Sequence, residues 1–146
     1  NNPNAQGVWF GLTHDSNRAT LTYSVLEGVS FALAQGAEAL HDSGLLPHEI
    51  NLIGGGARSS YWRQLLADVL NLTLTFREGG EVGPALGAAR LARLALEPGT
   101  SLAEICPPPP LVSQHQPDAE RHAILATRYQ RFKALYLALE PHFPSA

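Results

Sequence analysis

Apolar residues recur at three- and four-residue spacing over four stretches of the chain, and this spacing places them on one face of an α-helix. Each stretch is bounded by residues that start or stop helices, such as Ser43-Gly44 as a C-terminal stop, Pro84 at a first helical position and Asp118 as an N-cap. The predicted helices span residues 18–42, 59–70, 84–97 and 118–140.

Shorter apolar runs lie between these helices and predict β-strands at residues 8–12, 50–53 and 72–76, the last with alternating apolar and polar side chains. Alternation of strands with helices is typical of the α/β fold class. Three short strands are few for this many helices, so we expect the chain to contribute part of a larger sheet.

Two helices carry residues that predict close packing. Gly28 and Gly36 lie inside the first helix, where each costs about 1 kcal/mol relative to alanine, and such a cost is usually accepted where another element comes close. The helix that begins at Pro84 is rich in alanine along one face. We expect both helices to pack tightly against neighbouring elements.

The composition of the 146 residues is that of one domain with a sizeable core, because 45% are hydrophobic and only 16% are charged. A net charge of -3 gives no basic surface for nucleic acid, and no apolar run approaches the ~20 residues that span a bilayer. One cysteine, Cys106, cannot form an internal disulfide and fits the reducing cytoplasm. The chain contains no methionine, so we expect it to be part of a longer protein.

Prolines 107–110 form a stiff extended spacer, and we expect residues 107–117 to be a Pro-rich connector that leads to the terminal helix at 118–140. A connector is favoured over a ligand for a proline-binding domain. The aspartates also suggest structural roles: Asp118 caps a helix, and Asp68 lies on an apolar helix.

The most informative segment is Gly54-Gly55-Gly56, which lies between the second predicted strand and the second predicted helix. Glycine lets a backbone approach a ligand closely, and a helix N-terminus offers free N–H groups and partial positive charge, so phosphate is a natural guest. A P-loop is excluded because it needs a lysine here and the only lysine is Lys133. A plain turn and a dinucleotide site, with Glu78 after the next strand, both stay open.

Three segments resemble the FGGY carbohydrate kinases and occur in the family's order. They are the turn 54–59 (GGGARS) with the helix 61–68 after it, the segment 7–12 (GVWFGL) with 24–28 downstream, and the segment 79–90. Leu21 departs from the pattern, which usually has a polar residue there. The tail also resembles that of the bacterial, xylulose-phosphorylating members, so the likeness covers essentially the whole chain.

The resemblance implies an actin-like ATPase fold of the ribonuclease H type, with residues 1–146 as the second half of the C-terminal, nucleotide-binding domain. It implies transfer of the ATP γ-phosphoryl group to the 5-hydroxyl of D-xylulose with the help of Mg²⁺. The backbone of Gly55, Gly56 and Ala57 would approach the adenosine and α-phosphate. Ser60, one turn into the helix, would lie near the adenine.

The catalytic aspartate, the loops around the outer phosphates and the metal ligands are expected outside this chain, so we assign it no catalytic and no metal-binding residue. We therefore expect the chain to be inactive alone, to bind ATP weakly and to need the N-terminal part of the same enzyme; a homodimer is a further possibility. A kinase for another sugar or polyol, an NAD(P)-binding domain and a non-catalytic actin-like module remain alternatives.

Overall fold

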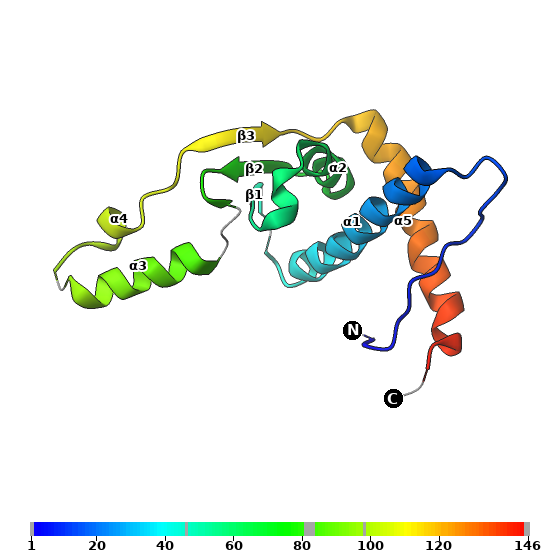
Figure 1. Cartoon of the computed structure of the whole chain (residues 1–146), viewed down its shortest axis with the longest axis horizontal. Helices are drawn as coiled ribbons and strands as arrows, with labels where there is room; N and C mark the ends of the chain where they lie inside the picture. Colours follow the sequence, from blue (N-terminus) through cyan, green and yellow to red (C-terminus); the bar gives the residue numbers. More distant parts are fainter. Residues whose placement is uncertain (1, 46, 81–83, 98, 145–146) are drawn as a thin grey trace.

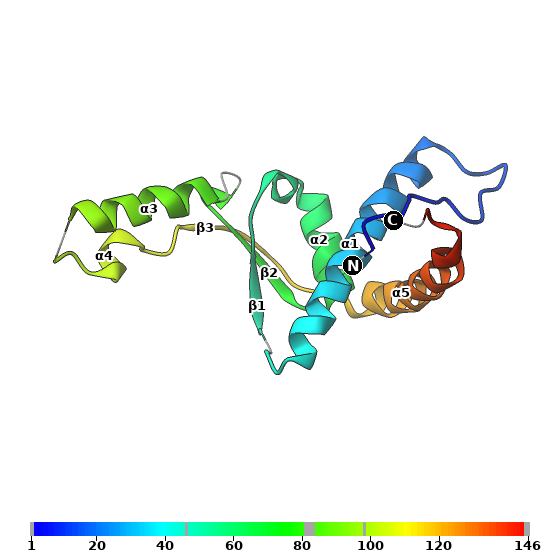
Figure 2. The same cartoon turned by 90° about the horizontal axis from the view of Figure 1, so that it is seen from below.

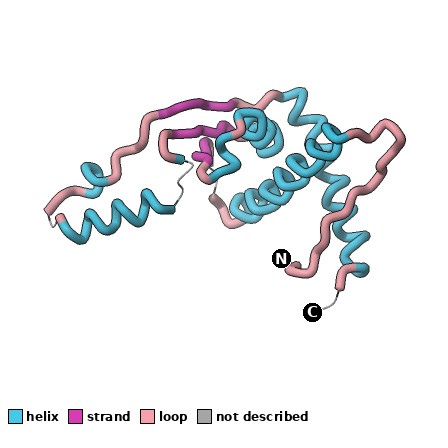
Figure 3. Tube along the Cα trace, viewed as in Figure 1, coloured by secondary structure: helices cyan, strands magenta, loops and turns pink. Residues whose placement is uncertain are grey.

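The computed structural model describes residues 2–45, 47–80, 84–97 and 99–144. It confirms the α/β class: helices and strands alternate along most of the chain, and three strands form one sheet (Figures 1 and 3). In chain order the elements are α1 (Arg18–Asp42), β1 (Glu49–Leu52), η1 (Gly55–Arg58), α2 (Ser60–Leu70), β2 (Thr73–Arg77), α3 (Pro84–Leu96), α4 (Leu102–Ile105), β3 (Leu111–His115), α5 (Ala119–Leu139) and η3 (Glu140–His142).

The sheet has the order β1-β2-β3 and is mixed. Strands β1 and β2 are parallel, with Glu49 opposite Thr73 and Leu52 opposite Phe76, and α2 makes the crossover between them. Strand β3 is antiparallel to β2, with Leu74 opposite His115 and a register shift between Phe76 and Arg77. The carboxyl end of β1 therefore leads directly into the glycine turn.

Helix α2 is the central element, because it packs on α1 and α5 on one side and on the sheet on the other (Figure 2). Its ends are set locally: the Ser59 hydroxyl accepts a hydrogen bond from the Trp62 N–H, and Asn71 stops the helix in a left-handed conformation with φ 53°. Two apolar clusters result. One joins α1, α2 and α5 and contains Phe31, Ala34, Leu65, Leu125 and Tyr129; the other joins α2 to β2 and contains Leu66, Ala67 and Leu74.

The predicted strand at 8–12 is wrong. These residues form no strand, and the side chains of Val8, Trp9, Phe10 and Leu12 are 52–62% exposed. The sheet of the described chain offers no neighbour to this segment, and an apolar run is a strand only where backbone partners lie beside it. The Phe10 ring lies instead 5.5 Å from the guanidinium of Arg131 on α5.

The expectation that 107–117 is only a connector is also wrong. Residues 107–110 have no regular structure, but Leu111–His115 form β3, because β2 has an edge free to pair with them. The Pro110 carbonyl accepts a hydrogen bond from the Glu78 N–H at 3.0 Å, which brings the tail to the end of β2. Helix α4 was not predicted either; a capping box between Ser101 and Glu104 starts it.

Close packing is absent at both places where it was expected. In the described chain a methyl group added at Gly28 or Gly36 would meet no atom within 4 Å, and Val25, Val29 and Leu33 on the same helix are 43–51% exposed. Helix α3 buries none of its residues and packs on α4, away from the rest of the chain (Figure 1). Alanine and glycine content alone did not reveal which faces are covered within this chain.

Candidate functional site

The glycine turn connects the carboxyl end of β1 to the first turn of α2. Gly54 has φ 92°, a conformation that side chains rarely adopt, and its N–H donates to the Gly80 carbonyl at 2.7 Å, after β2. The Ala57 N–H then donates to the Gly54 carbonyl at 3.0 Å, and the Ser59 N–H to the Gly56 carbonyl at 3.2 Å. The turn is therefore one hydrogen-bonded unit, anchored to the neighbouring loop.

Three groups of the turn are available to a ligand. The N–H groups of Gly55 and Gly56 make no hydrogen bond to any described residue, and both glycines are exposed. Ser60 is also exposed, and its hydroxyl bonds to no described residue. Free N–H groups beside the N-terminus of the 11-residue helix α2 favour an anionic ligand. Ser60 is the first residue of α2, so its predicted place one turn into the helix is wrong, because Ser59 is the N-cap.

Ala57 has a different environment from its neighbours. It is 7% exposed, its N–H is bonded within the turn, and its carbonyl accepts a hydrogen bond from the Arg63 guanidinium. Both polar groups of its backbone are thus used inside the protein. The structure brings Gly55, Gly56 and Ser60 together at the surface and places Ala57 behind them as a support.

Trp62 fixes the inner side of the turn. A methyl group added at Gly56 would lie 2.1 Å from Cζ3 of the Trp62 ring, so only glycine fits there. The indole Nε1–H donates to the Ser30 hydroxyl on α1 at 2.9 Å, which holds the ring in place. Trp62 also packs against both apolar clusters.

Arg63 is a buried cation directly behind the turn. Its Nε donates to Nε2 of His115 on β3 at 3.1 Å, and its guanidinium lies 4.6 Å from the centroid of the Phe76 ring on β2. Burial lowers the pKa of His115, the charge of Arg63 lowers it further, and Asp68 opposes the shift. Sequence reasoning missed the contact of Arg63 with His115, because it spans 52 positions and His115 lies in none of the recognised segments.

The cavity at the turn measures about 170 Å³ and is lined by the turn itself and by side chains such as Leu33, Leu52 and Leu66. Small-molecule sites usually enclose about 300–1,000 Å³, so this cavity can hold only part of a nucleotide. None of the described residues that line it is a carboxylate, and the described residues contain no group of three or more His, Cys, Asp or Glu side chains that could hold a metal ion.

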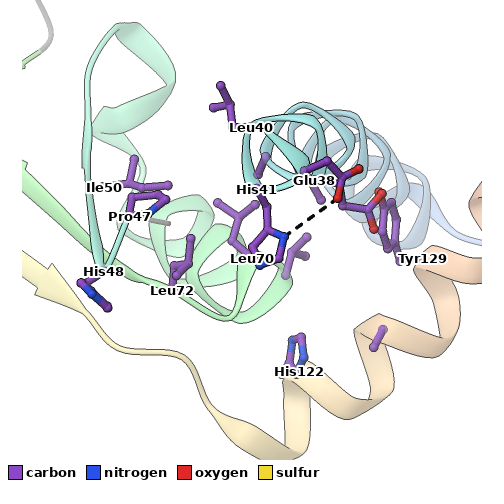
Figure 4. A pocket seen from close by; sticks show the side chains of 15 residues that line it. Glu38, Leu40, His41, Pro47, His48, Ile50, Leu70, Leu72, His122 and Tyr129 are labelled. Atoms are coloured by element: carbon purple, nitrogen blue, oxygen red, sulfur yellow. Dashed lines mark hydrogen bonds and ion pairs between the residues drawn. The ribbon is translucent and has the colours of Figure 1, made fainter. Parts of the chain in front are cut away.

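A larger cavity of about 440 Å³ lies at the other end of α2 (Figure 4). It is lined by the last turns of α1 and α2, the start of β1 and the first half of α5, with Glu38, His41 and Tyr129 among its polar residues. The C-terminal ends of helices carry partial negative charge and disfavour phosphate. The glycine turn is therefore the better candidate for an anionic ligand.

Two aspartates that the sequence singled out, Asp68 and Asp118, make structural contacts. Asp68 is fully buried, pairs with the Arg121 guanidinium at 3.1 Å and accepts a hydrogen bond from the Asp118 N–H at 3.0 Å. Asp118 caps α5 through the Arg121 N–H, as predicted. No helix of the described residues is long and apolar enough to cross a membrane.

Comparison with known proteins gives one consistent match. Residues 1–96 match the family model described as the C-terminal domain of the FGGY family of carbohydrate kinases. The chain is 52% identical over 141 residues to the xylulose kinase of Escherichia coli and 48% identical to that of Klebsiella pneumoniae, covering 97% of this chain in each case. It spans 29% of the length of these relatives.

The solved structures agree. The crystal structure of a kinase from Brucella ovis, titled a "xyloylose kinase", superimposes with a TM-score of 0.83 at 37% identity, over 94% of this chain and 28% of that one. The crystal structure of xylulose kinase from Rhodospirillum rubrum gives a TM-score of 0.81 at 28% identity, over 97% of this chain and 29% of that one.

Proposed function

The chain belongs to the FGGY family of carbohydrate kinases, and from this premise we propose that the protein carrying it transfers the γ-phosphoryl group of ATP to D-xylulose, giving D-xylulose 5-phosphate. The observation that carries the proposal is the 52% identity to a xylulose kinase over 97% of the chain. Identity this high over both the matched domain and the tail favours the xylulose kinases over other members of the family.

Within that enzyme the glycine turn would hold the inner part of ATP. The free N–H groups of Gly55 and Gly56 suit the α-phosphate and adenosine, and the Ser60 hydroxyl is placed to bond the base or ribose. Ala57 contributes by keeping the turn in shape, since its own N–H and carbonyl are engaged. The small volume of the cavity supports a site completed by the rest of the polypeptide.

Phosphoryl transfer also requires a carboxylate that positions the acceptor hydroxyl and a cation that offsets the phosphate charge. The part of the turn that the structure describes offers neither, since none of the described residues lining its cavity is a carboxylate. We therefore place the catalytic carboxylate, the Mg²⁺ ligands and the sugar contacts in the N-terminal part of the same enzyme. We place the enzyme in the cytoplasm, where ATP is available, and a homodimer is an assembly that light scattering can test.

The test is ADP release by the intact protein with D-xylulose, glycerol or gluconate as acceptor. We expect the highest kcat/KM with D-xylulose. No xylulose-dependent ADP release would overturn the substrate, and a preference for glycerol or gluconate would move the protein elsewhere in the family. Calorimetry with ATP and NAD separates the kinase from a dinucleotide-binding domain, because tight NAD binding without ATP binding contradicts the kinase.

A further inference from the structure

Arg63 makes more contacts between elements than a surface arginine would. It is only 9% exposed, and arginine is rarely buried unless its donors are satisfied. Its partners come from three different elements: the Ala57 carbonyl in η1, the Phe76 ring on β2 and the His115 imidazole on β3. One buried side chain therefore joins the glycine turn to the strand that the tail adds to the sheet.

We propose that Arg63 is a positioning residue for the nucleotide, and that β3 sets its position through His115. This inference rests on the proposed function, in which the turn holds ATP. The carbonyl that Arg63 binds belongs to the peptide between Ala57 and Arg58, in the middle of a turn closed by its own hydrogen bonds. We expect that release of this carbonyl would loosen the turn and so shift the neighbouring Gly55 and Gly56 N–H groups, although Arg63 touches no ligand itself.

His115 can hold Arg63 only in one protonation state. Its Nε2 accepts from Arg63, so the ring proton is on Nδ1, which donates to Oε1 of Gln64 at 3.2 Å. The Gln64 amide then donates to Asp68 at 2.8 Å and to the Gln116 carbonyl at 2.9 Å. The imidazole is thus neutral, and its orientation is set by bonds on both ring nitrogens.

Through this cluster, a residue outside the family domain contributes to the proposed nucleotide site. The family model matches residues 1–96, whereas His115 lies in the tail that follows. The tail would therefore influence ATP binding indirectly, from behind the turn. If Arg63 acts by positioning the turn, a variant that loses its contacts should bind ATP more weakly but bind the sugar as the wild type does.

The first test is Arg63→Lys in the intact protein, because lysine keeps the charge but cannot reach Ala57 and His115 together. We expect KM for ATP to rise about tenfold, which is what one lost hydrogen bond of ordinary strength is worth. KM for D-xylulose and kcat should stay within about twofold, because the lost contact acts on nucleotide binding alone.

Arg77→Lys is the matched control. Arg77 also donates from a guanidinium to a backbone carbonyl, that of Pro109 at 3.0 Å, and also ties the tail to the sheet. Its guanidinium is directed toward Pro109 and Glu49 and forms no hydrogen bond with the described residues of the turn. We expect this variant to keep the wild-type KM for ATP. An equal rise in both variants would show that docking of the tail, and not the position of the turn, controls ATP binding, which overturns the proposal.

His115→Ala tests the second step, and measured alone, together with His115→Gln, it also covers the case in which Arg63→Lys does not fold. His115→Ala alone should raise KM for ATP about threefold and add nothing in the Arg63→Lys background, because His115 acts through Arg63. His115→Gln, whose amide oxygen can accept from Arg63, should restore the wild-type value. Additive effects, or no rescue by glutamine, would overturn the role of His115.

The two proposals fail in different ways. If the wild-type protein does not phosphorylate D-xylulose with ATP, the proposed function fails. If the wild type is active and Arg63→Lys keeps its KM for ATP, or loses affinity for both substrates equally, the positioning role fails while the function stands.

Discussion

Gly56→Ala is the change whose effect follows most directly from the geometry of the turn. The new methyl carbon would lie 2.1 Å from Cζ3 and 2.9 Å from Cε3 of the Trp62 ring, whereas ordinary contact begins at about 3.4 Å. The ring therefore has to retreat by more than 1 Å. It cannot do so freely, because its Nε1–H is bonded to the Ser30 hydroxyl at 2.9 Å.

The free-energy cost of Gly56→Ala has two parts. Overpacking a well-packed site costs about 1–3 kcal/mol, and the broken hydrogen bond between Trp62 and Ser30 adds about 1 kcal/mol. The turn and the first turn of α2 should thus lose about 2–4 kcal/mol of local stability. Hydrogen exchange of the intact protein measures this loss at the segment itself, and the exchange of residues 57–64 should accelerate about 30-fold or more.

Gly55→Ala is the control, because a methyl group there meets no described atom within 4 Å and its φ is not positive. The hydrogen-exchange rates of Gly55→Ala should match those of the wild type. Trp62→Phe should relieve the clash, since the shorter side chain does not reach the new methyl group. Gly56→Ala should therefore lower local stability less in the Trp62→Phe background than in the wild type. Equal exchange in Gly56→Ala and Gly55→Ala would refute the view that Trp62 excludes a side chain at 56.

Further predictions concern affinity, the buried carboxylate and pH. Gly55→Ala should raise KM for ATP several-fold in steady-state assays, because its methyl group stands where the nucleotide approaches; an unchanged KM contradicts the proposed role of the turn. Asp68→Asn removes a fully buried charge from its pair with Arg121 and should lower the free energy of unfolding by about 2 kcal/mol in urea titrations. A loss below about 0.5 kcal/mol would show that this pair contributes little. The pKa of His115 is below its ordinary 6.5 in the folded protein, so the unfolded chain binds its proton more readily. The free energy of unfolding should therefore fall as the pH drops below about 6.5 and through the pKa of His115 in the folded protein. The free energy of unfolding of His115→Gln should fall less steeply, and parallel pH curves for the two proteins would contradict this.

The long helices were predictable because their signals are local. The bounds of α1 agree with the prediction, since Asn17 and Ser43 cap it at positions set by neighbouring residues. The start of α5 at the Asp118 cap was predicted for the same reason. Periodicity and caps operate within a few residues, so a single sequence contains them.

The strands were harder, because a strand exists only with a partner. The run at 8–12 is more apolar than Leu111–His115, yet only the latter is paired, with β2 more than 30 positions earlier in the chain. Neither run contains a local signal of its partner. The same reason explains why β3 was assigned to a connector and why the contact of Arg63 with His115 was not foreseen.

At the site, the residue pattern predicted the turn between strand and helix correctly, whereas the resemblance assigned equal roles to residues with different environments. Gly55, Gly56 and Ala57 were expected to approach the nucleotide in the same way. The structure gives exposed N–H groups to the two glycines and uses both polar groups of Ala57 internally. Each of the three neighbouring positions favours glycine for a different physical reason: a positive φ at 54, open access for a ligand at 55 and the Trp62 ring at 56.

These contacts argue that the family domain and the tail form one structural unit. Strand β3 completes the edge of β2, and α5 covers the α1–α2 cluster through Leu125 and Tyr129. The fully buried Asp68 of α2 pairs with the Arg121 guanidinium and accepts a hydrogen bond from the Asp118 N–H, both in the tail. The buried arginine in the first turn of α2, Arg63, likewise has one of its partners, His115, after residue 96. We therefore expect the shape of the glycine turn to depend on His115, a residue that the sequence assigned to a connector.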